Sequence, residues 1–206
     1  MARQLRSVRT RARILQTAVE HFIRSGFEGT SVDEICNAAG VSKGAFYHHF
    51  PSKQALFLAL LQEWVQELED RLAAIREEYE WVPQRFERMA EMLRHVFEQA
   101  AGKAPMFLEF WYQATKDSIT WNASVQPYQR FRSIFAQWIE EGIQQGSLKS
   151  IDPNLAAATL VSLGVGLVLQ VALERQGFDW PKIPLGAVTL LLEGLSSPNR
   201  GFGQNI

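Results

Sequence analysis

The residues of this sequence that could do chemistry are concentrated in one short stretch, Gly40 to Phe50, which reads GVSKGAFYHHF. It holds two adjacent histidines, His48 and His49. Neighbouring residues on a helix point to different faces, and no cysteine or acid lies at ligand spacing beside them, which argues against a metal site. No nearby carboxylate could orient a histidine for general-base catalysis. We therefore expect neither a metal site nor a catalytic site here, and no cofactor.

The same stretch also has the properties of a surface that binds an anion. Phe46 and Phe50 are four residues apart, so on a helix they share one face and are expected to be core. Lys43 and Gly44 fall in the first turn, where backbone N–H groups are free and the helix dipole favours an anion. Gly44 has no side chain, so a large polyanion can approach the backbone closely. A purely structural helix end is the competing interpretation, but it does not explain why Tyr47 and both histidines gather with two lysines.

The flanking residues predict a helix-turn-helix unit. Ser31 followed by Glu34 is the sequence of a capping box and predicts the start of a helix, which Gly40 then ends. Short helices joined by a tight glycine-containing turn are typical of the helix-turn-helix. The expected helices cover about 12–24, 32–39, 42–49 and 52–79.

One longer stretch carries a family resemblance. Residues Phe27 to Leu60 read FEGTSVDEICNAAGVSKGAFYHHFPSKQALFLAL. The capping box, AGVSKG, the aromatic F-Y-x-x-F ladder and the P-S-K-x-x-L restart follow one another as they do in the tetracycline-repressor (TetR) family of bacterial transcription regulators, whose DNA-binding region this stretch resembles. The resemblance covers most of residues 10–60. Ala45 stands where the family often has Thr or Ser, and Cys36 stands where it often has Ala.

The resemblance implies a DNA-binding role without enzyme activity. Residues 41–50 would hold the recognition helix, which enters the major groove. A homodimer would bind double-stranded DNA at a palindromic operator. The positions that match phosphate-binding residues are Thr30, Tyr47 and Lys53, and those that match groove-facing residues are Ser42, Lys43, Gly44, Ala45 and His48, with His49 completing the expected DNA-binding set.

Charge and cysteine content agree with that role. Residues 1–53 hold eight Lys or Arg and four Asp or Glu, a net charge of +4 in a chain whose total is −1. We expect a basic arm over about residues 1–10. Its Arg3 and Arg6 would contact the DNA backbone or minor groove, or else lie in a disordered, solubilising tail. Cys36 is the only cysteine, so no intrachain disulfide can form, which fits a cytoplasmic protein that is nucleoid-associated when bound to DNA.

The rest of the chain predicts more helices and no strands. Apolar residues recur at helical spacing, and prolines or glycines mark the boundaries. The expected fold is all-α with about nine helices. We expect a helix-turn-helix domain over 1–53, joined by a long helix to a larger helical effector-binding and dimerisation domain over 54–197, and a flexible tail over 198–206.

The most apolar segment, Leu155 to Leu173, is 19 residues long and uncharged. That length would suit a membrane span, but polar residues interrupt it and no anchoring residues flank both ends. We expect no membrane contact and favour a dimer interface over burial within one subunit. The residues expected at this interface are Leu160, Ser162, Leu163, Gly166, Leu167, Leu190 and Leu191.

Aromatic residues cluster between positions 107 and 138. Such a cluster is more often core, but small-molecule pockets are also mostly apolar with a few polar groups. We therefore expect an apolar or aromatic effector of unknown identity, with polar contacts from Gln113, Asn122, Glu109 or Lys116. The aromatic residues expected to line the pocket are Phe107, Phe110, Trp111, Tyr112, Trp121, Phe135 and Trp138.

The resemblance also implies a mechanism. Effector binding would shift the long helix over 52–79 and change the separation of two recognition helices, which must lie about 34–36 Å apart. Three alternatives remain open from the sequence: an enzyme with an aromatic active site, an architectural DNA-binding protein without an effector, and an activator in place of a repressor.

Overall fold

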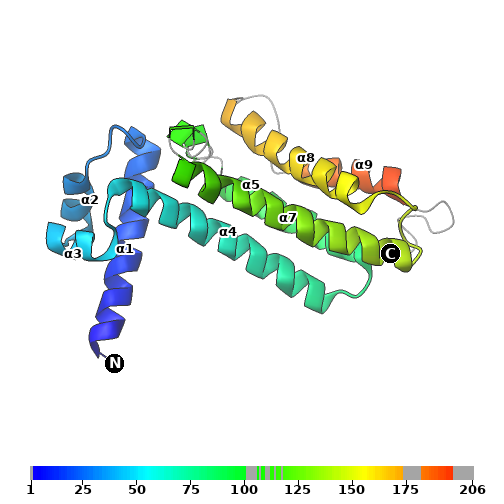
Figure 1. Cartoon of the computed structure of the whole chain (residues 1–206), viewed down its shortest axis with the longest axis horizontal. Coiled ribbons are helices and arrows are strands. Elements are labelled where there is room, and N and C mark those ends of the chain that lie inside the picture. Colours follow the sequence, from blue (N-terminus) through cyan, green and yellow to red (C-terminus); the bar gives the residue numbers. More distant parts are fainter. Residues whose placement is uncertain are drawn as a thin grey trace. The chain divides into compact units, whose positions relative to one another are not determined.

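The computed structural model of the chain describes residues 2–100, 106, 108, 109, 112, 113, 115, 116, 118–173 and 182–196 (Figure 1). Side chains are described for these residues except 2, 3, 96–100, 118–120, 123, 124 and 171–173.

The expected all-α fold is confirmed. The described residues form long helices and no strand, with one isolated bridge between Leu148 and Ser196. The helices are α1 (Ala2–Ser25), α2 (Val32–Ala39), α3 (Lys43–His49), α4 (Lys53–Glu78), α5 (Val82–Ala100), α7 (Ser118–Gln144), α8 (Pro153–Leu173) and α9 (Ile183–Leu195).

The chain divides into two compact units, and the division differs from the expected boundary at residue 53. The first unit contains Met1–Gln66 together with Pro105–Ser124. It extends into α4 because Leu56 and Phe57 are fully buried in its core. Met106 is 2% exposed in the same core, so a segment distant in sequence completes it.

An aromatic cluster holds the first unit together. The ring of Phe27 lies 5.6 Å from that of Phe22 and 4.8 Å from that of Phe57, measured between centroids. These rings join α1, the turn after α1 and α4. The fully or almost fully buried side chains around them include Ile14, Ala18, Ile35, Phe46, Phe50 and Leu60.

Local sequence signals set the bounds of α2 and α3. The Ser31 hydroxyl accepts a hydrogen bond from the Glu34 N–H at 3.2 Å, and a Glu34 carboxylate oxygen accepts one from the Ser31 N–H at 2.7 Å. This is the expected capping box, and it satisfies two N–H groups that the helix leaves free. Gly40 ends α2 with φ of 61°, a left-handed conformation that glycine adopts without strain.

The second unit contains Glu67–Ala104 and Val125–Ile206. Its core centres on Trp138, which is fully buried, with the Phe86 and Phe135 rings at 5.6 and 5.9 Å from its own. Helices α5, α8 and α9 close this core, and α9 packs against both of the others.

Two helices begin earlier than the sequence patterns predict. The basic arm is not a tail, because α1 is helical from Ala2. Helix α7 begins at Ser118 and contains Pro127 in its interior, where we expected proline in the first turn of a helix from about residue 124. A proline in a helix interior lacks one backbone N–H donor, and this 27-residue helix continues past that gap.

Helix α8 is mostly apolar and carries no charged residue. Among the described helices it is the one long and apolar enough to cross a membrane by length and composition, a test that core helices of soluble proteins also pass. Only 22% of its most apolar 18-residue window is fully buried, and Leu155 and Leu169 are among its exposed residues.

A polar cluster ties the start of α5 to α7 in the second unit. Arg85, 5% exposed, donates to the Glu141 carboxylate and, through Nε, to the Tyr79 carbonyl at 2.6 Å. Arg76 of α4 donates to the same carboxylate. Burial raises the pKa of Glu141, but hydrogen bonds from the two arginines outweigh it and leave this pKa below its usual value.

We predict that Glu141→Gln destabilises the protein, because it leaves Arg85 buried without a charged partner. Charge-assisted hydrogen bonds contribute about 1.5–3 kcal/mol each, so the free energy of unfolding should fall by roughly that amount. Since the Glu141 pKa is lowered on folding, its contribution is present above the unfolded pKa and is lost as the pH falls through the folded one. Urea unfolding between pH 3 and 7 would measure both effects. Glu140→Gln, an exposed neighbour, is the matched control, and equal losses in the two variants would contradict the prediction.

Candidate nucleic-acid interface

The position of α3 depends on one buried face. Phe46 is fully buried and Phe50 is 3% exposed, while Tyr47 is 52% exposed. Ser42 caps the helix, with its hydroxyl accepting the Ala45 N–H at 3.1 Å. The structure therefore fixes this seven-residue helix through its inner face and presents the other face to solvent.

The outer face carries most of the expected DNA-binding side chains. Ser42, Lys43, Gly44, Tyr47 and His48 are exposed. The structure brings these five together on one surface of the first unit. Two further members of the expected set, Ala45 and His49, are half-buried at its edge.

The packing around position 44 does not require a glycine there. A Cβ atom built on it would have the Ser42 hydroxyl oxygen as its nearest neighbour, at 3.8 Å, which is ordinary van der Waals contact. Gly44 is the second residue of α3, and a glycine in a helix costs more backbone entropy on folding than an alanine. Gly44 therefore costs stability without relieving any crowding inside the protein. The close approach of an outside backbone, such as that of DNA, would require a glycine at such a position.

Lys43 is paired within the unit. Its ammonium group lies 2.6 Å from a carboxylate oxygen of Asp33 on α2, and both side chains are well exposed. The hydrogen bond to Asp33 raises the pKa of Lys43, so this lysine is charged at neutral pH. Exposed ion pairs contribute about 0–1 kcal/mol, so a DNA phosphate can compete with Asp33 for this lysine.

The histidine pair has no partners that would make it a metal site in the described part of the chain. Burial, followed by the charges of His48 and Arg11, lowers the pKa of His49, which is therefore mostly neutral at pH 7. Within the part of the chain that the structure describes, no group of three or more His, Cys, Asp or Glu side chains could hold a metal ion. Burial raises the pKa of the Cys36 thiol, which keeps it protonated and unreactive.

Thr30 does not fit the expected phosphate contact. Its side chain is 1% exposed, and its hydroxyl lies 2.8 Å from the Gly26 carbonyl and 3.2 Å from the His21 carbonyl. In this geometry Thr30 holds the turn between α1 and α2. The sequence places Thr30 at the right spacing but does not show that its hydroxyl is turned inward.

Lys53 is engaged with the same turn. Its ammonium group donates to the carbonyls of Phe27 at 2.6 Å and Thr30 at 2.8 Å, and it lies 4.3 Å from the centroid of the Phe27 ring. An ammonium group has three donors, so at most one is left for a phosphate. The main contacts of Lys53 are thus with this turn, and DNA contact is secondary.

The residues of the expected aromatic pocket are divided between the two units and the part of the chain outside the described residues. Phe135 and Trp138 are buried in the core of the second unit, whereas Tyr112 and Trp121, 56% and 46% exposed, belong to the first. Phe107, Phe110 and Trp111 lie outside the described residues. Phe135 and Trp138 of α7 are therefore core residues of the second unit.

The expected polar contacts of that pocket meet the turn of the first unit instead. Gln113 donates to Glu109 at 2.6 Å and to Glu28 at 3.4 Å, and Lys116 pairs with Glu28 at 3.0 Å. Glu28 follows Phe27 in the turn between α1 and α2. The segment over 106–116 therefore contacts the same turn that Lys53 clamps.

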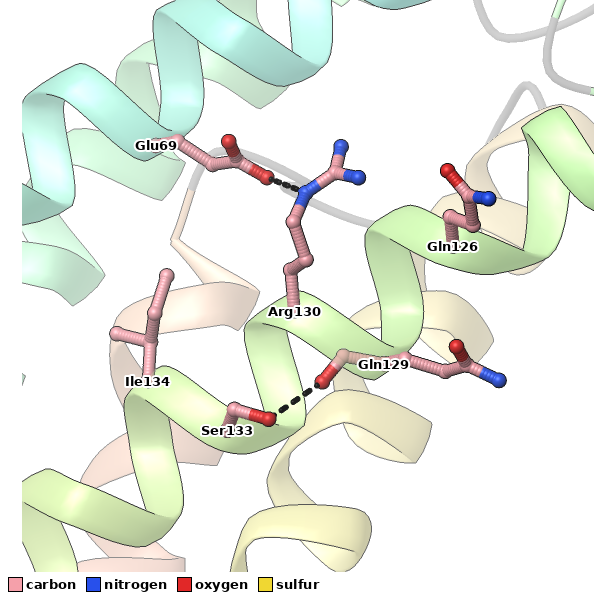
Figure 2. A pocket seen from close by; sticks show the side chains of 6 residues that line it. All are labelled: Glu69, Gln126, Gln129, Arg130, Ser133 and Ile134. Carbon is pink, nitrogen blue, oxygen red and sulfur yellow. Dashed lines mark hydrogen bonds and ion pairs between the residues drawn. The ribbon is translucent and has the colours of Figure 1, made fainter.

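A groove in the second unit was not anticipated. It has a volume of about 540 Å³ and lies along α7 beside α4 (Figure 2). Figure 2 shows the Arg130 guanidinium, which donates to the Glu69 carboxylate at 2.5 Å. Positions 126, 129, 130 and 133 share one face of a helix, so the sequence did contain a signal for this groove. Its lining residues are Glu69, Gln126, Gln129, Arg130, Ser133 and Ile134.

The expected dimer residues divide into two groups. Leu160 and Leu167, 6% and 5% exposed, pack inside their own subunit and are not available to a partner. Ser162 is exposed and Leu190 is 72% exposed, while Leu163, Gly166 and Leu191 are half-buried. The helical spacing identified the helices correctly but did not separate the inward face from the outward one. The large exposed apolar residues on α8 and α9 are Leu155, Leu169, Leu185 and Leu190.

Together, the fold and the α3 surface define a helix-turn-helix DNA-binding regulator. Comparison with known families agrees. Residues 14–60 match the bacterial regulatory proteins of the tetR family, and residues 86–182 match the C-terminal region of BetI-type transcriptional repressors. The chain belongs to the TetR family of transcriptional regulators and is not an enzyme.

Curated relatives and solved structures are similar over most of the chain. The transcriptional repressor DhaR of a Mycobacterium species is 26% identical over 167 residues, covering 80% of this chain and 83% of its own. The regulator UidR of Escherichia coli is 27% identical, with the same coverage. A TetR regulator from Haloarcula marismortui superposes with a TM-score of 0.83 at 15% identity, over 92% of this chain and all of its own. A regulator from Saccharomonospora viridis in complex with choline superposes with 0.78 at 23% identity, over 92% and 99%.

We predict that Gly44→Ala has opposite effects on stability and on DNA binding. The added methyl group meets nothing closer than the Ser42 hydroxyl oxygen at 3.8 Å, so the free energy of unfolding should rise by roughly 0.4–1 kcal/mol. The same methyl group should obstruct the approach of DNA and weaken binding. Thermal unfolding and fluorescence anisotropy with labelled duplex DNA would measure the two effects on one preparation. Unchanged DNA affinity in a stabilised variant would show that Gly44 does not face the DNA.

Proposed function

We propose that the protein is a homodimeric repressor that binds a palindromic operator through α3 and leaves it when a small effector binds the second unit. The observation that carries this proposal is the outer face of α3, where Gly44 leaves the backbone open between exposed Lys43 and Tyr47. The name of the relative DhaR supports repression over activation.

Each DNA-facing residue has a role in this proposal. Tyr47 and Lys43 bind phosphates, and Lys43 exchanges its Asp33 partner for one of them. Ser42 and His48 lie where base edges can be contacted, and Ala45 offers a methyl group to thymine. Lys53 holds the turn that orients this surface.

The dimer in this proposal uses the exposed faces of α8 and α9. Large exposed leucines, Leu155 and Leu169 on α8 with Leu185 and Leu190 on α9, give a soluble protein a reason to pair. A second copy would cover α8 without any membrane contact. A dimer also places two recognition helices on one duplex, about one helical turn apart. These features fit a protein that works in the cytoplasm.

The groove along α7 is our candidate for effector binding. Its lining is mostly apolar by area and carries one ion pair, so the groove suits an effector that combines an apolar body with a polar or charged group. A ligand with a positive group would compete with Arg130 for Glu69, and one with a negative group would compete with Glu69 for Arg130. The choline complex of the Saccharomonospora viridis regulator makes choline a sensible first probe.

The segment over 105–124 offers a route from effector to DNA. It belongs to the first unit, where Met106 fills the core and Lys116 pairs with Glu28, while both of its ends continue into the second unit. An effector that alters α7 would act on this segment through the chain itself. The turn between α1 and α2, and with it the position of α3, would then respond.

The first experiment is selection of binding sites from random duplex DNA by the purified protein at fixed salt. We expect a palindrome whose half-sites are spaced for two-fold binding. Recovery of no motif, with binding that follows salt alone, would overturn sequence-specific regulation. The selected duplex then serves to screen small organic cations and anions, beginning with choline, for release of the protein.

For a compound found in that screen, we predict that Arg130→Gln or Glu69→Gln shifts the concentration that releases half of the DNA. Loss of one charge-assisted hydrogen bond, about 1.5–3 kcal/mol, corresponds to a shift of roughly 10- to 100-fold. Arg132→Gln removes an exposed arginine of α7 that does not line the groove and is the matched control. Equal release concentrations for all three variants and the parent would place the effector elsewhere.

A further inference from the structure

The first three turns of α1 extend past the core of their unit. Ile14 is the first buried residue of α1 among those whose side chains are described, so residues 2–13 precede the buried part of this helix. At 1.5 Å per residue they span roughly 18 Å. Leu5 and Val8 are 59% and 62% exposed, and Figure 1 shows this end of α1 reaching away from α2 and α3.

Three arginines follow one face of this extension. Arg6, Arg9 and Arg13 are spaced three and seven residues apart, which puts them on one side of a helix. All three are exposed, and none forms a hydrogen bond or ion pair with any residue in the described ranges. Arg11, which points elsewhere, is instead paired with Glu63 of α4. The row of three is therefore a concentrated positive charge without a partner among the described residues.

The N-terminal end of α1 also lacks an acidic side chain. The N-terminal end of a helix has a positive dipole, so cations near it destabilise the helix and anions stabilise it. No acidic residue precedes Glu20 in the sequence, and the first turn of α1 holds none. An external polyanion would satisfy both the arginines and the helix end.

The extension starts beside the recognition helix. The Arg11 guanidinium lies 5.4 Å from the centroid of the Phe50 ring, and Phe50 caps the C-terminal end of α3. The charge of Arg11 also contributes to the lowered pKa of His49, the last residue of α3. The arginine row thus begins near the C-terminal end of α3, the helix that would lie in the major groove. Phosphates next to that groove would be within reach of the row.

We propose that Ala2–Arg13 is a second DNA-binding element, in which Arg6, Arg9 and Arg13 contact backbone phosphates that flank the half-site read by α3. This inference rests on the proposed DNA-binding function and adds to it a longer footprint on each side of the operator. The contacts set affinity and register and carry no sequence preference.

The test compares the full-length parent with the variant Arg6→Gln/Arg9→Gln/Arg13→Gln. Glutamine keeps helix propensity, and the replaced side chains are exposed, so the fold is retained, as far-UV circular dichroism would verify. Binding is measured by fluorescence anisotropy between 50 and 200 mM salt. Two duplexes are used, the selected half-sites alone and the same half-sites with ten added base pairs on each flank, about one further helical turn. The charge-matched control is Arg71→Gln/Arg88→Gln/Arg132→Gln, which removes three exposed arginines from the second unit.

On the flanked duplex we expect the slope of log affinity against log salt to become shallower by about 0.9 for each lost phosphate contact, hence about 2.7 per subunit. The parent should bind the flanked duplex more tightly than the short one, and the variant should bind both equally. The control should behave as the parent does. A parent slope retained in the variant would overturn the second element while leaving α3 as the DNA-binding helix. Failure of the parent to bind either duplex would overturn the proposed function and this inference together.

Discussion

The whole DNA-binding surface depends on the burial of Phe46. A helix of seven residues is too short to be stable by itself in water, because its nucleation costs more than its few hydrogen bonds return. Phe46 is fully buried and Phe50 nearly so, and together with the Ser42 cap they fix α3 in one position. Every exposed residue of α3 therefore takes its direction from a contact on the opposite face.

The turn between α1 and α2 is the second point on which this arrangement depends. Three parts of the first unit meet there. Lys53 donates to its carbonyls, Thr30 closes it from inside, and Lys116 and Gln113 reach Glu28 from the segment after α5. A regulator has to be rigid enough to bind DNA and still respond to a ligand. A turn held by several polar contacts of modest strength satisfies both needs, because each contact can be exchanged without unfolding the core.

Charge is separated along the chain in a way that follows from these roles. The first unit carries the arginine row of α1 and the lysine of α3, whereas several arginines of the second unit have internal partners. Arg76 and Arg85 share Glu141, and Arg130 is held by Glu69. Arginines that have internal partners hold helices together, and those without partners in the described residues are available to an external polyanion.

The sequence by itself determined the helix-turn-helix, its family, and the all-α fold. Capping residues, glycine stops and the aromatic ladder act over a few residues, so they can be recognised without knowing the rest of the molecule. Only the tertiary structure decided which way a given side chain points. It turned Thr30 and Lys53 onto the turn, put Phe135 and Trp138 in a core, and showed the Arg6–Arg13 face to be part of a helix rather than of a loose arm. These outcomes depend on contacts between residues far apart in sequence, and helical spacing alone gives a face but not its surroundings.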